Sequence, residues 1–72
     1  MPDHVYKVID IVGSSDKSIE DAVQTAIARA TRTISNLRWF EIMQTRGHVE
    51  DSRITYQVML RVGFTLDDTL ED

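Results

Sequence analysis

The stretch from Ile54 to about Leu66 alternates apolar and mostly polar residues, and this regularity constrains the fold more than any other feature of the chain. A period of two places successive side chains on opposite faces of a β-strand. The apolar positions therefore share one face, which we expect to pack on a helix: Ile54, Tyr56, Val58, Leu60, Val62 and Phe64.

A single helical pattern, from Ile19 to about Asn36, is available to cover that face. Its apolar residues recur every three or four positions, as in an amphipathic helix: Ile19, Val23, Ala26, Ile27, Ala30, Ile34 and Leu37. Ser18 fits the N-cap, with Asp21 at the third helical position, close to a capping box. The alanines at 22, 26 and 30 lie along one edge of the helix and should let another backbone approach closely.

Two further segments have the character of strands. Val5–Val12 is rich in β-branched residues, and Trp39–Val49 follows the helix. Residues 13–17 should break the first strand, and Glu50–Arg53 should form the turn between the second and third. The order strand, helix, strand, strand predicts an α+β fold. We expect a three-stranded antiparallel sheet curled around one helix, because strands of this length twist.

Apolar side chains are expected on both faces of this sheet. Val5–Val12 is apolar on both sides, which is typical of a strand covered on both sides. Strict alternation puts Phe40, Ile42 and Met59 on the face away from the helix, and such a patch is normally a contact surface. A chain of 72 residues without cysteine also cannot form the disulfide crosslinks that stabilise many small domains. Self-association is therefore predicted.

Charge divides the chain into a balanced domain, residues 1–66, and an acidic C-terminal tail, residues 67–72. The tail holds four of the twelve acids, and the eight that remain equal the eight Lys and Arg residues. The basic footprint of a nucleic-acid-binding protein is absent from the sequence. No apolar run is long enough to span a membrane, and no signal peptide is recognisable, so we expect a cytoplasmic protein without nucleic-acid or membrane partners.

The candidate binding residues lie on the predicted hairpin. Closing its turn with Val49 opposite Ile54 sets Arg46 opposite Gln57, both pointing away from the helix. Trp39 is open to two interpretations, a core residue or a stacking platform for a flat ligand. Strict alternation puts Trp39 on the opposite face from Arg46, so a joint site requires either a β-bulge between them or a contribution from a neighbouring subunit.

The sequence gives little sign of a set of catalytic residues. The sequence has no Cys, no Ser-His-Asp arrangement and no nucleotide-binding glycine loop, and His4 and His48 are isolated. Glu41 could serve as a general acid, but a solvated or salt-bridged carboxylate on a strand is the more common situation. Met43 and Met59 are better explained by packing than by ligand binding. We therefore predict a binding protein rather than an enzyme.

Taken in order, five segments resemble the bacterial dodecins: residues 5–15 (VYKVIDIVGSS), 26–30 (AIARA), 37–41 (LRWFE), 45–48 (TRGH) and 56–64 (YQVMLRVGF). The resemblance covers residues 1–66 and leaves out the acidic tail. It implies a hollow homododecamer that binds flavins and serves in their storage, sequestration and photoprotection rather than in catalysis. Bacterial members favour FMN over riboflavin and are also associated with coenzyme A.

The same resemblance assigns roles to individual residues. Trp39 stacks on the isoalloxazine ring, Gln57 hydrogen-bonds its pyrimidine edge, and Arg46 lies near the flavin pocket. Gln44 stands where some members place a pocket-lining acid. Thr65 stands where many bacterial members have an arginine, which bears on phosphate binding. Two alternatives stay open: a small flavin-dependent reductase, and a structural or ion-binding oligomer without flavin.

Overall fold

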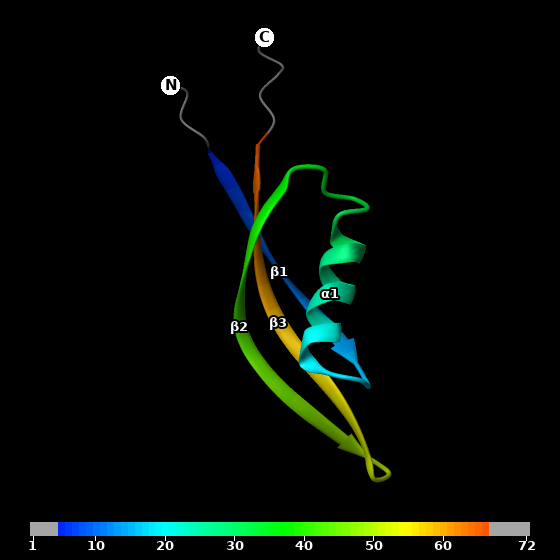
Figure 1. The fold of residues 1–72 in the computed structure, drawn as a ribbon. Coiled ribbons are helices and arrows are strands. Elements are labelled where there is room, and N and C mark those ends of the chain that lie inside the picture. Colours follow the sequence, from blue (N-terminus) through cyan, green and yellow to red (C-terminus); the bar gives the residue numbers. More distant parts are fainter. Residues whose placement is uncertain (1–4, 67–72) are drawn as a thin grey trace.

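The computed structural model describes residues 5–66 and confirms the predicted order of elements (Figure 1). Strand β1 spans Tyr6–Ser15, helix α1 Ile19–Ala30, strand β2 Leu37–Glu50 and strand β3 Arg53–Thr65. The expected acidic tail, residues 67–72, lies outside the described residues. The bounds of β2 and β3 differ from the predicted ones by one or two residues, which is the usual uncertainty of a strand end.

The central strand of the sheet is β3, which pairs antiparallel with β1 on one side and β2 on the other. The sheet curves, and α1 lies on its concave side (Figure 1). As the alternation predicted, the apolar face of β3 is turned toward α1, where Val58, Leu60 and Val62 are fully buried. We call this side of the sheet the helix face and the opposite side the open face.

A network of hydroxyls and a carboxylate fixes the start of α1. Ser18 is the N-cap, and its Oγ accepts a hydrogen bond from the Asp21 backbone N–H at 2.9 Å. The Asp21 carboxylate does not complete a capping box with the Ser18 N–H. It accepts instead from the Oγ of Ser15 at 2.7 Å, and that Oγ accepts in turn from the Lys17 N–H at 2.9 Å. The network ties the end of β1 to the first turn of α1.

The prediction that the helix continues to Asn36 is wrong, because α1 ends at Ala30. The hydroxyls of Thr31 and Thr33 donate to the carbonyls of Ala28 and Ala30, competing with regular helical hydrogen bonds. The chain tightens here, with Thr33 N–H donating to the Ala30 carbonyl at 3.1 Å. The 12 residues of α1 span about 18 Å instead of the 27 Å expected. Ile34 N–H still donates to the Ala30 carbonyl, as in a helical turn. The helical spacing of apolar residues therefore continues in the sequence beyond the last residue of α1.

The first strand is also longer than predicted, because residues 13–15 continue β1. Gly13 pairs with Val58 beneath α1. A Cβ atom on Gly13 would lie 2.5 Å from the Ala22 carbonyl oxygen and 2.8 Å from Ala26 Cβ. The glycine is therefore needed for the close approach of helix and strand, and the expectation that the alanine edge of the helix admits another backbone is confirmed.

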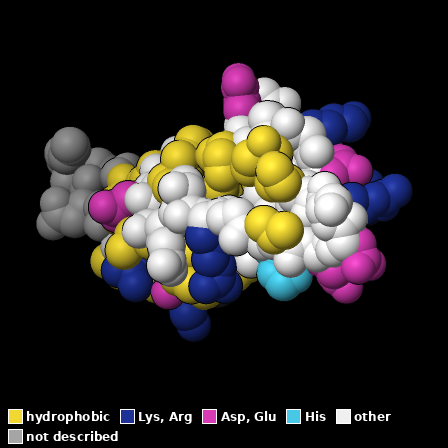
Figure 2. All heavy atoms as spheres, turned by 90° about the horizontal axis from the view of Figure 1, so that it is seen from below, with side chains coloured by type: hydrophobic (Ala, Val, Ile, Leu, Met, Phe, Trp, Pro, Cys, Tyr) yellow, Lys and Arg dark blue, Asp and Glu magenta, His cyan; other side chains and the backbone are white. Residues whose placement is uncertain are grey.

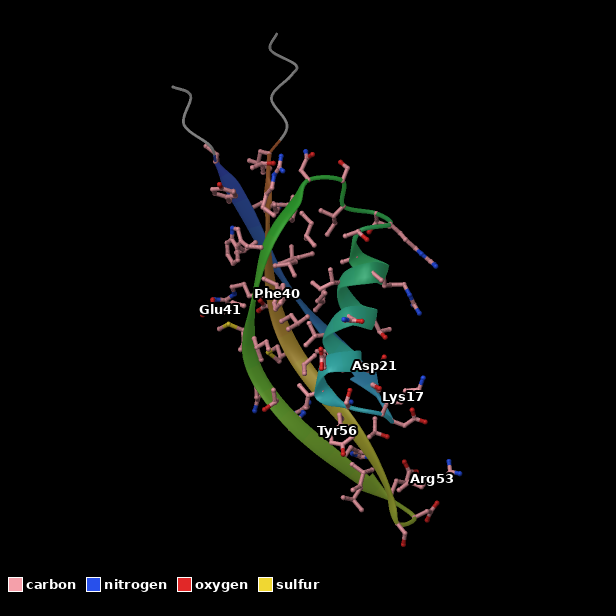
Figure 3. The ribbon with its side chains drawn as sticks, in the orientation of Figure 1. Lys17, Asp21, Phe40, Glu41, Arg53 and Tyr56 are labelled. Atoms are coloured by element: carbon pink, nitrogen blue, oxygen red, sulfur yellow. The ribbon has the colours of Figure 1, made fainter. Side chains whose placement is uncertain are left out.

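Two register shifts interrupt β2, one between Leu37 and Trp39 and one between Ile42 and Gln44. The second is a β-bulge that reverses the alternation of the residues from Trp39 to Ile42. Phe40 and Ile42 pair with Val62 and Leu60, which lie on the helix face. The prediction that Phe40 and Ile42 lie on the face away from the helix is therefore wrong. Figure 3 shows Phe40 and Glu41 on opposite sides of β2, with Glu41 directed away from α1.

Both faces nevertheless expose apolar side chains. Helix α1 packs over β1 and β3, which leaves Phe40 beside a groove lined by Val23, Ile27 and Ala28. On the open face Val8, Val12 and Trp39 are exposed, so the predicted cover on both sides of β1 is not provided by the described part of this chain. Hydrophobic side chains also reach the surface among charged ones at the end of the molecule seen from below (Figure 2). Exposed apolar surface on both faces favours self-association.

Candidate functional site

The open face is an ordered set of cross-strand rows. The β-bulge puts Trp39, Glu41, Gln44 and Arg46 on this side of β2, opposite Gly63, Arg61, Met59 and Gln57 of β3, respectively. From β1 the same rows receive Val8, Asp10, Val12 and Ser14. The bulge that the sequence left open is present, and it brings Trp39 and Arg46 to one face of one chain.

Trp39 lies outside the core, with 39% of its surface exposed. Its indole lies over Gly63, on the neighbouring strand, and meets Tyr6 of β1 edge-on, with the ring centroids 6.5 Å apart and the planes at 64°. The ring thus extends from β2 across β3 toward β1. Trp39 is therefore not part of this chain's own core, and a large part of the indole is open to another molecule.

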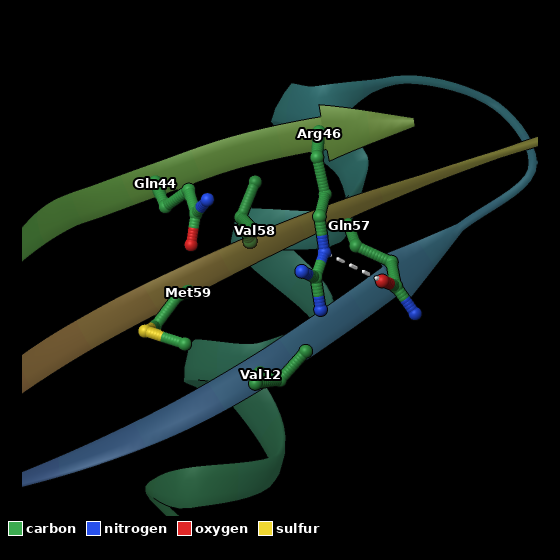
Figure 4. A pocket seen from close by; sticks show the side chains of 6 residues that line it. All are labelled: Val12, Gln44, Arg46, Gln57, Val58 and Met59. Atoms are coloured by element: carbon green, nitrogen blue, oxygen red, sulfur yellow. Dashed lines mark hydrogen bonds between the residues drawn. The ribbon is translucent and has the colours of Figure 1, made fainter. Parts of the chain in front are cut away.

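The predicted pairing of Arg46 with Gln57 is confirmed, and it continues to the third strand. Arg46 Nε donates to Gln57 Oε1 at 3.2 Å, and Gln57 Nε2 donates to Ser14 Oγ at 3.5 Å. Beside this row is a small depression, with a volume of about 10 Å³, lined by Val12, Gln44, Arg46, Gln57, Val58 and Met59 (Figure 4). The carboxamides of Gln44 and Gln57 and the Arg46 guanidinium therefore provide donors and acceptors around an apolar floor.

A charged row that sequence reasoning missed lies between Trp39 and this depression. Arg61 of β3 donates to both carboxylate oxygens of Asp10 on β1, at 3.0 and 3.3 Å. Glu41 faces Arg61 from β2. The hydrogen bond from Arg61 lowers the pKa of Asp10, and the Asp10 carboxylate raises the pKa of Arg61. Only the register between β1 and β3 reveals this pair, and no short turn joins those strands to fix that register in the sequence.

Distance along β3 separates the candidate residues into two groups. Trp39 is opposite Gly63 and Arg46 is opposite Gln57, six residues further along the strand. At about 3.3 Å per residue, this spacing is roughly 20 Å. One chain therefore groups Gln44, Arg46 and Gln57 together and holds Trp39 apart from them on the same face.

Neither a metal-binding cluster nor a membrane-spanning helix is present among the described residues. No group of three or more His, Cys, Asp or Glu side chains among them is placed to hold a metal ion. Within residues 5–66, no helix has the length and apolar character needed to cross a bilayer.

The family model for dodecins matches residues 5–67 of the chain. The chain belongs to the dodecin family. It is 44% identical over 66 residues to a dodecin of Thermus thermophilus, an alignment that covers 90% of this chain and 96% of that one. The structure of a dodecin from Streptomyces davaonensis superposes with a TM-score of 0.87 at 43% identity, covering 92% of this chain and 98% of that one.

Another relative carries a different name. The calcium dodecin of Mycobacterium tuberculosis is 36% identical over 63 residues, which cover 86% of this chain and 89% of the relative. Its crystal structure is described as having a calcium-binding site, and it superposes with a TM-score of 0.81. Dodecins are small binding proteins that assemble as oligomers, and calcium is the bound species named for this relative.

Proposed function

We propose that this dodecin binds a flavin, FMN or riboflavin, on the open face of its sheet and stores or sequesters it without catalysing a reaction. The observation that carries the proposal is the bulge in β2. It places a partly exposed indole on the same face as the carboxamide and guanidinium groups of Gln44, Arg46 and Gln57.

The side chains present fit the chemistry of a flavin. An exposed indole is a stacking surface for a planar ring, and stacking between a base and an aromatic side chain, a close analogue, contributes about 1–3 kcal/mol. Gln57 donates one N–H to Ser14 and accepts one bond from Arg46. A carboxamide has two N–H donors and two lone pairs, so Gln57 retains one of each for the donor and acceptor edge of a flavin.

The separation of the two groups indicates how copies must cooperate. About 20 Å along β3 exceeds the length of the three fused rings of an isoalloxazine. A ring stacked on Trp39 of one copy therefore meets Gln57 of a second copy. This is the arrangement expected of a homododecamer with flavins at its subunit interfaces, and it gives the exposed apolar side chains of the open face a partner.

Photoprotection follows from the stacking residue. An indole in contact with an excited flavin donates an electron to it and so quenches the excited state.

Thr65 pairs with Tyr6 at the end of the open face and carries no charge, so Arg46 is the side chain we expect near a phosphate. This makes the preference between FMN and riboflavin depend on Arg46.

The experiment that tests the proposal starts with protein purified without added flavin. We expect a discrete oligomer near twelve subunits by light scattering, with no well-folded monomer at micromolar concentration, and a yellow protein whose released ligand has the mass of FMN or riboflavin. The same mass analysis identifies coenzyme A if it copurifies. A colourless protein that also fails to bind added FMN and riboflavin would contradict flavin binding.

Two further measurements separate the alternatives. Rapid bleaching of the bound flavin by NADH would indicate a reductase, whereas a storage protein should leave the flavin oxidised.

The calcium dodecin among the relatives makes calcium the second ligand to test. Because the described part of one chain lacks a cluster of metal ligands, we expect calcium to leave flavin affinity unchanged. Calcium that binds to a colourless, flavin-free oligomer would favour the ion-binding alternative.

A further inference from the structure

The backbone conformation at Gly63 does not require a glycine. It lies in the middle of the central strand and pairs with Val8 on one side and Trp39 on the other. Glycine in a strand interior weakens the strand, because it adds no side-chain packing and loses more conformational freedom. None of the glycines in the described residues has a positive φ, so the conformation at Gly63 is open to any residue.

The reason for glycine is the space that the indole occupies. A Cβ atom on Gly63 would overlap Cε2 and Cζ2 of Trp39 and would lie 2.7 Å from Nε1. These three nearest atoms all belong to the indole, and Gly63 is itself buried. Because the indole is a side chain that can rotate, a methyl group at this position would displace the ring and leave the sheet in place.

Tyr6 provides the second contact of the indole. It lies on the opposite outer strand, opposite Thr65 and two residues along from the level of Gly63, and its ring meets Trp39 edge-on across β3. Edge-to-face contacts of this kind orient aromatic rings. The indole is therefore held from below by the Gly63 backbone and from one side by the Tyr6 ring.

We propose that Gly63 is a positioning residue that sets the stacking plane of Trp39, with Tyr6 as its supporting contact. The inference rests on the proposed flavin binding and extends it to residues that need not touch the ligand. A ring already held in its binding orientation loses little freedom when a ligand stacks on it, so affinity is gained without an additional contact.

Gly63→Ala tests this proposal, and Gly47→Ala is its matched control. A Cβ on Gly47 would meet only the Thr55 carbonyl oxygen, at 4.0 Å, which is ordinary contact. Both variants should form the wild-type oligomer. We expect Gly63→Ala to weaken flavin binding by about tenfold or more, the order of a displaced stacking contact, and to leave residual bound flavin brighter. Gly47→Ala should behave as wild type in both respects.

Because Trp39 is the only tryptophan in the chain, intrinsic fluorescence reports the ring without any ligand. In flavin-free protein, Gly63→Ala should increase the quenching of Trp39 emission by acrylamide and lower its anisotropy, whereas Gly47→Ala should change neither. Tyr6→Leu perturbs the ring without altering the strand beneath it. It should change the same signals in the same direction, with a two- to tenfold loss of flavin affinity, the order expected from one aromatic pair.

The outcomes separate this inference from the proposed function. If wild-type protein binds flavin and Trp39→Ala weakens the binding, but Gly63→Ala and Tyr6→Leu bind as wild type, the positioning role is wrong and the proposed function stands. If wild-type protein binds no flavin, the proposed function fails, and the acrylamide and anisotropy measurements still decide whether Gly63 positions the indole. If Gly63→Ala fails to assemble, Tyr6→Leu decides: wild-type affinity in that variant contradicts the proposal.

Discussion

Trp39 and Arg46 point to the same side of the sheet although they lie seven residues apart on one strand. In a regular strand an odd separation places two side chains on opposite faces. The bulge between Ile42 and Gln44 adds one residue to β2 without a partner on β3 and so brings both side chains to the open face. The same bulge turns Phe40 and Ile42 toward the helix face, so one irregularity determines the composition of both surfaces.

Trp39→Ala should weaken flavin binding by about 1–3 kcal/mol, because it removes the stacking surface. It also removes the electron donor, so flavin that remains bound should stay fluorescent, whereas wild-type protein should quench flavin fluorescence nearly completely. Trp39→Phe separates the two effects, since phenylalanine stacks but is a far poorer donor, and its bound flavin should be brighter. Fluorescence titration measures both quantities. Full affinity and full quenching in an intact Trp39→Ala oligomer would make Trp39 a packing residue.

Gln57→Leu should weaken flavin binding by about 1–3 kcal/mol, the cost of leaving buried polar partners unmatched. The substitution also breaks the row from Arg46 through Gln57 to Ser14. Assembly should survive, because the side chain lies outside the core. Light scattering checks the oligomer and titration checks the affinity. Ser14→Ala is a suitable control, since it removes only the 3.5 Å contact, and unchanged affinity in Gln57→Leu would exclude the assigned role.

Gly13→Ala should destabilise the fold by about 1–3 kcal/mol, the usual cost of overpacking. The new methyl group would approach the Ala22 carbonyl oxygen, which belongs to the helix backbone and cannot rotate away. Chemical denaturation of the oligomer at equal protein concentration measures the effect. Gly47→Ala adds the same atom at an open position, so equal midpoints for the two variants would show that α1 shifts freely away from β1.

Asp10 should make stability depend on pH in the acidic range. Hydrogen bonding from Arg61 lowers the pKa of Asp10 below its ordinary 3.8 in the folded state. The carboxylate therefore contributes stability above that ordinary value, and the contribution is lost as pH falls through the lower folded pKa. Both side chains are partly exposed, so the effect should be small and reduced by salt. Denaturation midpoints of wild type and Asp10→Asn should converge at low pH, and a constant difference between them would contradict this linkage.

Much of the hairpin could be predicted from the sequence. The two-residue period of Ile54–Leu66 fixed which side of β3 is buried, since only one set of alternate positions is apolar throughout. Pairing Val49 with Ile54 set the register, and the structure adds Asp51 and Ser52 at φ 52° and 66°, as in a tight two-residue hairpin turn. Arg46 opposite Gln57 then followed, because a short turn leaves no freedom in the pairing.

Only the tertiary structure decided where Trp39 lies. Apolar residues stand at both odd and even positions of this segment: Trp39, Phe40, Ile42 and Met43. The alternation pattern therefore gives no sign of a bulge. Packing of β2 against β3 and α1 selects it. The segment that connects β1 to β3 contains α1 and β2 rather than a tight turn. The register between β1 and β3, and with it the contacts of Asp10 with Arg61 and of Trp39 with Tyr6 across β3, therefore depends on how the helix packs. Local sequence determined the order of the elements and the turn end of the hairpin, whereas long-range packing determined the face on which they present a binding surface.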